Sequence, residues 1–204
     1  MTRIKICGLR RIEDIDYVNE FSPDYIGFVF AKKSKRYILP SVAKNLRKSL
    51  DSDIIPVGVF VDEDMEELVR ILNSGCIDTV QLHGREDNSY IDLLKSCSDC
   101  TVIKAFKVKK EDDIILANES HADLVLLDSG EGSGEEFDHS LIEGINRPYF
   151  LAGGLSQFNV ESAIKNLRPF GVDASSSLES YGFKYKDKIA SFINAVRKAD
   201  KNND

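Results

Sequence analysis

An alternation of eight short apolar segments with longer amphipathic stretches predicts an α/β fold for this 204-residue chain, a single (β/α)8 TIM barrel. The apolar segments are nearly continuous hydrophobic runs, which is typical of parallel strands covered on both faces. The turn after the first of them, Cys7-Gly8-Leu9-Arg10, lacks the G-x-G-x-x-G pattern of a dinucleotide-binding open sheet. A closed barrel is therefore favoured over a doubly wound sheet.

The predicted strands are short and rich in β-branched residues. The stretch 63–74 illustrates how the helices are assigned, because its apolar residues repeat at helical spacing and Gly75 follows as a stop signal. The predicted strands are Arg3–Cys7, Tyr25–Phe30, Pro56–Val61, Thr79–Leu82, Val102–Phe106, Leu124–Asp128, Tyr149–Ala152 and Gly171–Ala174. The predicted helices lie near residues 11–20, 40–50, 63–74, 87–97, 111–118, 139–145, 158–166 and 187–198.

Length and composition indicate one barrel domain over residues 1–199, followed by a polar tail, 200–204, that is expected to fray. The net charge of −7 predicts a surface that repels nucleic acid and anionic membranes. No apolar run approaches the ~20 residues of a membrane span, and the first strand begins too early for a signal peptide to precede it. The four cysteines show no disulfide-framework spacing, so we expect a cytoplasmic protein with reduced thiols.

Two polar residues at strand ends are candidates for chemistry, because active sites in β/α barrels lie at the carboxyl ends of the strands. Cys7 ends the first predicted strand. Asp128 follows the apolar run Leu124–Leu127, where a carboxylate is costly to bury without a partner. A thiolate and a carboxylic acid facing one pocket suit proton transfer at carbon and oxygen. Cys7 and Asp128 are therefore predicted as an acid–base pair, and the alternative for Cys7 is a small buried apolar residue.

Glycines and serines after the last two predicted strands indicate a phosphate site. Gly153 and Gly154 follow the seventh strand ahead of a helix, where backbone N–H groups and the helix N-terminus can attract an anion. Ser175 and Ser176 follow the eighth strand and add donors. These two loops are the usual phosphate site of this fold, although two ordinary turns would have the same composition.

Two basic residues have candidate roles near this site. Arg36 lies in the loop after the second strand, and its guanidinium fork suits a carboxylate; a solvated basic loop is the alternative. Lys5 shares strand parity with Cys7, so it should point into the barrel, where an unpaired ammonium is costly. We expect Lys5 to pair with Asp173 and to favour the Cys7 thiolate.

Three further signals carry less weight. The spacing Cys97-Ser98-Asp99-Cys100 lacks two more ligands for zinc, and it ends a predicted helix instead of beginning one as redox motifs do. His83 ends the fourth strand and is a candidate to line the pocket, with catalysis disfavoured. The stretch Gly130-Glu131-Gly132-Ser133-Gly134 is either a flexible loop or a mobile cover over a substrate.

In their order along the chain, these motifs resemble the phosphoribosylanthranilate isomerases, a family of tryptophan biosynthesis, from residue 4 to about residue 192. The resemblance implies a barrel of the ribulose-phosphate-binding type and a cofactor-free Amadori rearrangement of N-(5'-phosphoribosyl)anthranilate. The matching stretches are Lys5-Ile6-Cys7-Gly8-Leu9, Gly27-Phe28-Val29-Phe30, Ser34-Lys35-Arg36-Tyr37-Ile38, Gly58-Val59-Phe60, Gln81-Leu82-His83-Gly84, Leu127-Asp128-Ser129, Gly132-Ser133-Gly134 through Phe137-Asp138, Ala152-Gly153-Gly154-Leu155 and Gly171-Val172-Asp173-Ala174-Ser175-Ser176.

The resemblance also implies a role for each candidate. Asp128 would be the general acid that protonates the ribose ring oxygen, and Cys7 the general base that removes the C2' proton. Arg36 would hold the anthranilate carboxylate. Neither a metal nor a cofactor is implied, the only expected partner is the small phosphorylated substrate, and the chain is expected to be a monomer or a homodimer. The residues implied to bind phosphate are Gly153, Gly154, Ser175 and Ser176.

The chain departs from the family pattern at three positions. His139 stands where the family often has Trp, Ser177 replaces a common Gly beside the phosphate loop, and Tyr185 replaces a usual Asp. The Ser177 change leaves the shape and affinity of that loop open.

Rival functions fit less well. A lyase of the indole-glycerol-phosphate synthase type needs a catalytic Lys and Glu near the strand ends; Lys104 is a possible Lys, but no partner Glu is evident. The histidine-pathway isomerase has a carboxylate where this chain has Cys7. A non-catalytic phosphate-ligand-binding barrel would have no reason to hold both Cys7 and Asp128.

Overall fold

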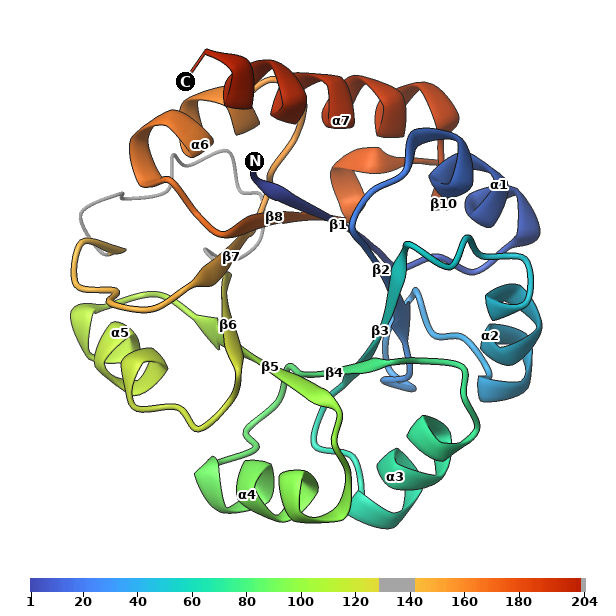
Figure 1. Cartoon of the computed structure of the whole chain (residues 1–204), viewed down its shortest axis with the longest axis vertical. Coiled ribbons are helices and arrows are strands. Elements are labelled where there is room, and N and C mark those ends of the chain that lie inside the picture. The colour runs from blue at the N-terminus through green and yellow to red at the C-terminus, as the bar shows by residue number, and fades with distance from the viewer. Residues whose placement is uncertain (129–141, 203–204) are drawn as a thin grey trace.

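The computed structural model describes residues 1–128 and 142–202, and Figure 1 shows a ring of strands surrounded by helices. Each strand pairs in parallel with the next, and the last pairs with the first to close the barrel. The predicted TIM barrel is therefore confirmed. Five strands have the predicted bounds, and β2, β3 and β5 differ by one residue at one or both ends. The strands are β1 Arg3–Cys7, β2 Tyr25–Val29, β3 Ile55–Phe60, β4 Thr79–Leu82, β5 Thr101–Lys107, β6 Leu124–Asp128, β7 Tyr149–Ala152 and β8 Gly171–Ala174.

The helices of the described residues lie close to the predicted positions. Residues 139–141 of the helix expected near 139–145 lie outside the described residues, and residues 142–145 form a turn in which the Ile145 N–H donates to the Ile142 carbonyl (3.0 Å). The helices are α1 Ile12–Phe21, α2 Pro40–Arg47, α3 Met65–Asn73, α4 Asn88–Cys97, α5 Glu111–Asn118, α6 Val160–Leu167 and α7 Lys186–Lys201. Helix α7 thus extends into the segment expected to fray, and the carboxylate of Asp200 accepts hydrogen bonds from the backbone N–H (3.0 Å) and hydroxyl (2.6 Å) of Thr2.

Local sequence explains where a helix such as α3 begins and which face it buries. The carboxylate of Asp64 caps the helix by accepting hydrogen bonds from the N–H groups of Glu66 and Glu67, which satisfies donors that have no partner within the helix. Leu68 and Ile71, three residues apart, are buried on one face. Helix α4 has the same combination, with Asp87 as its acidic cap and Ile91 and Leu94 as its buried apolar residues.

The barrel interior is packed in layers, as is usual for this fold. One layer surrounds Phe150, whose ring meets those of Tyr25 and Phe170 edge to face, with centroids 5.4 Å away in each case. Gly171 makes room for this ring, because a Cβ there would lie 2.5 Å from it. Nearer the carboxyl ends of the strands, Cys7 packs in a small cluster with buried valines of β2 and β3. The barrel is therefore filled beneath the position of the Cys7 thiol.

A short hairpin lies between β8 and α7. It follows the 3₁₀ helix Ser176–Leu178 and pairs β9, Glu179–Ser180, with β10, Phe183–Lys184. Tyr181 and Gly182 form the connecting turn with φ values of 52° and 79°, as in the two-residue turns that favour tight hairpins. The register places Lys184 opposite Glu179.

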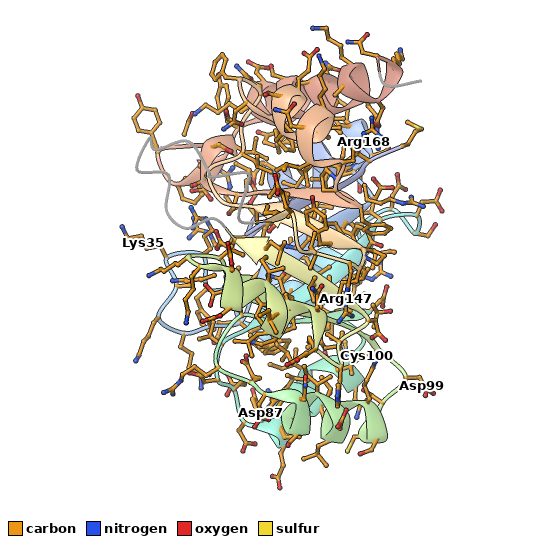
Figure 2. The ribbon with its side chains drawn as sticks, turned by 90° about the vertical axis from the view of Figure 1, so that its left-hand side faces the viewer. Lys35, Asp87, Asp99, Cys100, Arg147 and Arg168 are labelled. Atoms are coloured by element: carbon orange, nitrogen blue, oxygen red, sulfur yellow. The ribbon has the colours of Figure 1, made fainter. Side chains whose placement is uncertain are left out.

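Figure 2 shows the two ends of the barrel from the side. Lys35, in the loop after β2, lies at one end, and Asp99 and Cys100, in the loop before β5, lie at the other. The first end carries the loops that follow the strands, where active sites of this fold are built. None of the helices described in residues 1–128 and 142–202 combines the length and apolar character that crossing a bilayer requires.

Candidate active site

Cys7 lies at the carboxyl end of β1, with 8% of its surface exposed. Its neighbour across the sheet is Gly27, where a Cβ would lie 2.6 Å from the Cys7 Sγ. The absence of a side chain on Gly27 therefore makes room for the thiol. Burial raises the pKa of the Cys7 thiol above its ordinary value, and the nearby charge of Lys5 opposes this rise.

Lys5 points into the barrel and pairs with Asp173, as predicted. Its Nζ lies 3.0 Å from the Asp173 Oδ1, and its side chain is fully buried. Burial lowers the pKa of the Lys5 amine, but the Asp173 carboxylate, followed by Cys7, outweighs this effect and leaves the pKa raised. Lys5 is therefore a fixed cation close to the Cys7 thiol. The expected support for the thiolate is present, although burial of the thiol is the larger effect.

Asp128 ends β6 and faces His83, which follows β4. The His83 Nε2 lies 3.5 Å from the Asp128 Oδ2, and both side chains are about a quarter exposed or less (27% and 21%). The His83 Nδ1 is in turn 3.0 Å from the Gln81 Nε2. From the sequence, His83 was predicted only to line the pocket. Its position at a strand end was the available signal for its contact with Asp128.

Arg36 lies over the end of β1 in a bidentate pair with Glu179. Its Nε donates to Oε1 (2.6 Å) and its Nη2 to Oε2 (2.9 Å). Gly8, at φ +88°, permits this position, since a Cβ there would lie 2.4 Å from the Arg36 Cδ. Hydrogen bonding to Glu179 raises the pKa of Arg36. Sequence reasoning did not identify Glu179, whose only signal was its place just after the candidate phosphate serines.

The two candidate phosphate loops are linked to each other and to Cys7. Gly153 and Gly154 have φ values of 95° and 63°, which glycine adopts at little cost. The Ser175 hydroxyl donates to the Cys7 carbonyl (2.9 Å), and the Ser177 hydroxyl donates to the Leu155 carbonyl (2.5 Å). The departure from the family pattern at Ser177 therefore adds a hydrogen bond between the loops.

A helical element follows each of the candidate phosphate loops. Helix α6 begins at Val160, so residues 155–159 separate its N-terminus from Gly153 and Gly154. Ser176 is exposed and opens the short 3₁₀ helix after β8.

The order of the strands places these groups on one rim. In the closed sheet β6, β7, β8 and β1 are consecutive neighbours, as Figure 1 shows. The loops after β7 and β8, with their glycines and serines, therefore lie between Asp128 and Cys7 in the ring. Arg36 follows β2, the next strand after β1. An anion between the two loops would be held close to both members of the predicted acid–base pair.

The two cysteines of the C-x-x-C spacing lie at the two ends of the short connection between α4 and β5. Cys97 ends α4 and Cys100 precedes β5, both as free thiols, and Figure 2 shows Cys100 at the end of the barrel away from Lys35. The predicted cover at residues 130–134 and the departure at His139 lie outside the described residues.

Lys104 does have a glutamate partner, contrary to the sequence interpretation. Its Nζ lies 3.0 Å from the Glu86 Oε2, and both side chains are buried. The same amine donates to the carbonyls of Gly84 (2.7 Å) and Leu82 (3.4 Å). Glu86 also accepts hydrogen bonds from the N–H groups of Asp62 and Gly84. The pair thus holds the loops after β3 and β4. Sequence reasoning missed it because it depends on the folded path of these loops.

A closed parallel barrel with a thiol, a carboxyl group and two glycine- and serine-containing loops on its carboxyl-end rim defines a (β/α)8 enzyme. A family model described as N-(5'-phosphoribosyl)anthranilate (PRA) isomerase matches residues 4–195. The chain belongs to the N-(5'-phosphoribosyl)anthranilate isomerase family, and it is an isomerase.

Named relatives are similar in sequence along nearly the whole chain. The N-(5'-phosphoribosyl)anthranilate isomerase of Thermoanaerobacter sp. (strain X514) is 43% identical over 204 residues, which cover 97% of this chain and 98% of the relative. That of Clostridium kluyveri is 43% identical over 200 residues, with the same coverage of both chains.

Solved structures of phosphoribosyl anthranilate isomerases have the same fold as this chain. The phosphoribosyl anthranilate isomerase of Thermotoga maritima has a TM-score of 0.89 at 38% identity, covering 97% of this chain and all (100%) of its own. A complex of a phosphoribosyl anthranilate isomerase with reduced 1-(o-carboxyphenylamino)-1-deoxyribulose 5-phosphate has a TM-score of 0.86 at 37% identity, with the same coverage. The rival lyase and the non-catalytic barrel are not favoured.

Proposed function

We propose that this chain converts N-(5'-phosphoribosyl)anthranilate into 1-(o-carboxyphenylamino)-1-deoxyribulose 5-phosphate, with Cys7 as the general base and Asp128 as the general acid. The observation that most supports this proposal is the order of the strands around the barrel. The loops after β7 and β8 lie between the strands that end in Asp128 and Cys7. A substrate held there by its phosphate would present its ribose to both groups. The reaction belongs to tryptophan biosynthesis.

Asp128 acts first, in its protonated form. It gives its proton to the ribose ring oxygen as the bond from that oxygen to C1' breaks, and the nitrogen lone pair forms the C1'=N bond of an iminium. The ring oxygen becomes the 4'-hydroxyl. His83, 3.5 Å from the Asp128 Oδ2, helps to fix the direction of the carboxyl group.

Cys7 acts second, as the thiolate. It removes the proton from C2', and the electron pair of that C–H bond forms the C1'=C2' bond of an enolamine while the iminium nitrogen is neutralised. The 2'-hydroxyl then loses its proton and C1' gains one, which yields the ketone. Asp128 has lost one proton and Cys7 has gained one, so exchange with solvent restores both groups and the overall reaction is an isomerisation.

Binding is assigned to residues around this pair. Arg36 holds the anthranilate carboxylate, since a guanidinium fork suits that group. The substrate phosphate lies at Gly153, Gly154, Ser175 and Ser176, against the global charge of −7. The positive φ values of both glycines support this site.

The setting of the reaction follows from the cysteines and from relatives. The reaction takes place in the cytoplasm, where thiols stay reduced, as Cys7 must be in order to act as a base. The Thermotoga maritima isomerase is described as dimeric, and a crystal structure of monomers generated from it is also known. The working state of this chain is a monomer or a homodimer that binds a small phosphorylated substrate.

The test is turnover of N-(5'-phosphoribosyl)anthranilate made in situ, followed by loss of its fluorescence. Wild type should be active, and Cys7→Ala and Asp128→Ala should each lose at least ~10²-fold in kcat, as expected for an acid–base group. Cys97→Ala, an exposed cysteine at the far end of the barrel, is the matched control and should keep full activity. A folded but inert wild type would refute the substrate, and an active Cys7→Ala would refute the base.

A further inference from the structure

The pairing of Arg36 with Glu179 leaves one edge of the guanidinium available. Glu179 occupies the edge formed by Nε and Nη2, at 2.6 and 2.9 Å. Within residues 1–128 and 142–202, no hydrogen-bond partner is found for Arg36 Nη1, and the side chain is 28% exposed. The edge formed by Nη1 and the second N–H of Nη2 presents two parallel donors, which is the geometry that a second carboxylate needs for a bidentate contact.

Glu179 is itself fixed by a buried cation. The Lys184 Nζ lies 2.8 Å from the Glu179 Oε1, and the Lys184 side chain is fully buried. The same amine donates to the Ser175 carbonyl (2.9 Å). Burial raises the pKa of Glu179, but hydrogen bonds from Arg36 and Lys184 outweigh this effect and leave it lowered. Glu179 is therefore anionic and has two cationic partners.

We propose that Glu179 is a positioning residue that sets the plane of Arg36 for the substrate carboxylate, with Lys184 as its anchor. This inference rests on the proposed role of Arg36. An arginine that is partly exposed at a rim has many side-chain conformations, and ordering it on binding would cost affinity. A bidentate partner on one edge removes that freedom before the substrate arrives, and the opposite edge stays open.

The same contacts join three parts of the site. Lys184 connects Glu179 to the carbonyl of Ser175, and the Ser175 hydroxyl donates to the Cys7 carbonyl (2.9 Å). The carboxylate subsite, the loop after β8 and the end of β1 are thus one hydrogen-bonded unit. In the short hairpin between β8 and α7, the strand register sets Lys184 opposite Glu179. The hairpin therefore supplies both the carboxylate that contacts Arg36 and the amine that contacts Ser175.

The experiment is a double-mutant cycle on turnover of N-(5'-phosphoribosyl)anthranilate with wild type, Glu179→Gln, Arg36→Met and the double variant. Glu179→Gln keeps the side-chain shape but removes the charge. We expect KM to rise about 10-fold and kcat to stay within about 3-fold, since loss of a binding contact affects both substrate and transition state. In the Arg36→Met background the same change should have no further effect on KM. Inhibition by inorganic phosphate should be unaltered in Glu179→Gln.

Each outcome bears on one claim. An equal rise in KM with and without Arg36 would show a general structural role for Glu179 and overturn the inference. An Arg36→Met variant with unchanged KM would instead refute the proposed role of Arg36. If Glu179→Gln does not fold, Glu179→Asp keeps the charge beside Lys184 and shortens the reach to Arg36, and the same cycle applies. Glu161→Gln, which breaks the exposed pair with Lys198 (3.0 Å), is the control and should match wild type.

Discussion

The ammonium group of Lys5 lies 3.0 Å from the Asp173 Oδ1, on the strand that closes the barrel against β1. Lys5 and Cys7 are two residues apart on β1, so their side chains point to the same face. The ion pair thus places a compensated cation beneath the thiol that we propose as the base. The charge of Lys5 lowers the pKa of Cys7, whereas burial of the thiol raises it.

Replacing Lys5 with Met should raise the pKa of Cys7 further. The charge of Lys5 favours the thiolate, so its removal leaves burial unopposed by this group. Because only the thiolate can accept the C2' proton, kcat/KM should rise with pH up to the Cys7 pKa, and this rise should move to higher pH in Lys5→Met. Titration of the thiol by its absorbance, together with the pH profile, measures both effects.

A second effect of Lys5→Met must be separated from the first. Loss of the cation leaves the Asp173 carboxylate buried without its partner, and breaking a buried pair in this way costs ~3–5 kcal/mol. The double variant Lys5→Met with Asp173→Asn removes both charges and should recover most of the unfolding free energy. The Asp173 charge raises the pKa of Cys7 while the Lys5 charge lowers it, so the double variant is compared with Asp173→Asn alone. Equal thiol titrations in these two folded variants would contradict the role of Lys5.

Replacing Gly27 with Ala should disturb the base directly. The new Cβ would lie 2.6 Å from the Cys7 Sγ and 3.1 Å from its Cα, so the thiol or the strand must move. Overpacking of this kind costs ~1–3 kcal/mol, and a displacement of ~1 Å at a reacting group can cost ~10²-fold in rate. Thermal unfolding and kcat report the two losses. Gly144→Ala, where the nearest atom is 3.5 Å away, should change neither.

Replacing His83 with Asn should lower kcat more than it alters KM. The His83 Nε2 lies 3.5 Å from the Asp128 Oδ2, and a shorter side chain would leave the proposed acid without this neighbour. We expect a loss of about 10-fold, part of the ~10²-fold attributable to the position of a reacting group. Steady-state kinetics check this. His121→Asn, whose ring contacts Asp92 (2.8 Å) on the surface, should behave as wild type, and an equal loss in both variants would contradict a role for His83.

The fold was predictable because barrel strands are covered on both faces, which makes them continuous apolar runs in the sequence. Cys7 and Asp128 followed from the same signal, since the end of each run marks the rim where chemistry occurs. The Lys5–Asp173 pair followed from strand parity and from the closure of β8 on β1. These inferences need only the period of a strand and the order of strands in the ring.

The groups that were missed depend on contacts that no periodicity encodes. Glu179 and Lys184 lie on strands of two residues each, too short for an alternation to be visible. Their pairing follows from a turn whose register only the folded chain displays. Glu86 reaches Lys104 from a loop. That loop packs closely against Asp62 because Gly84 has no side chain; a Cβ there would lie 2.4 Å from the Asp62 Oδ1.

Replacing Ser177 with Ala tests the departure beside the phosphate loop. The Ser177 hydroxyl donates to the Leu155 carbonyl (2.5 Å), which ties the loop after β8 to the loop after β7. A hydrogen bond of this kind contributes about 1 kcal/mol, which corresponds to about 5-fold in a binding constant. If the link holds both loops in place for phosphate, the inhibition constant of inorganic phosphate and KM should each rise by about this factor, with kcat little changed. Ser52→Ala, an exposed serine in the loop before β3, is the control. Phosphate inhibition equal to that of wild type would mean that the two loops keep their phosphate-binding geometry without this link.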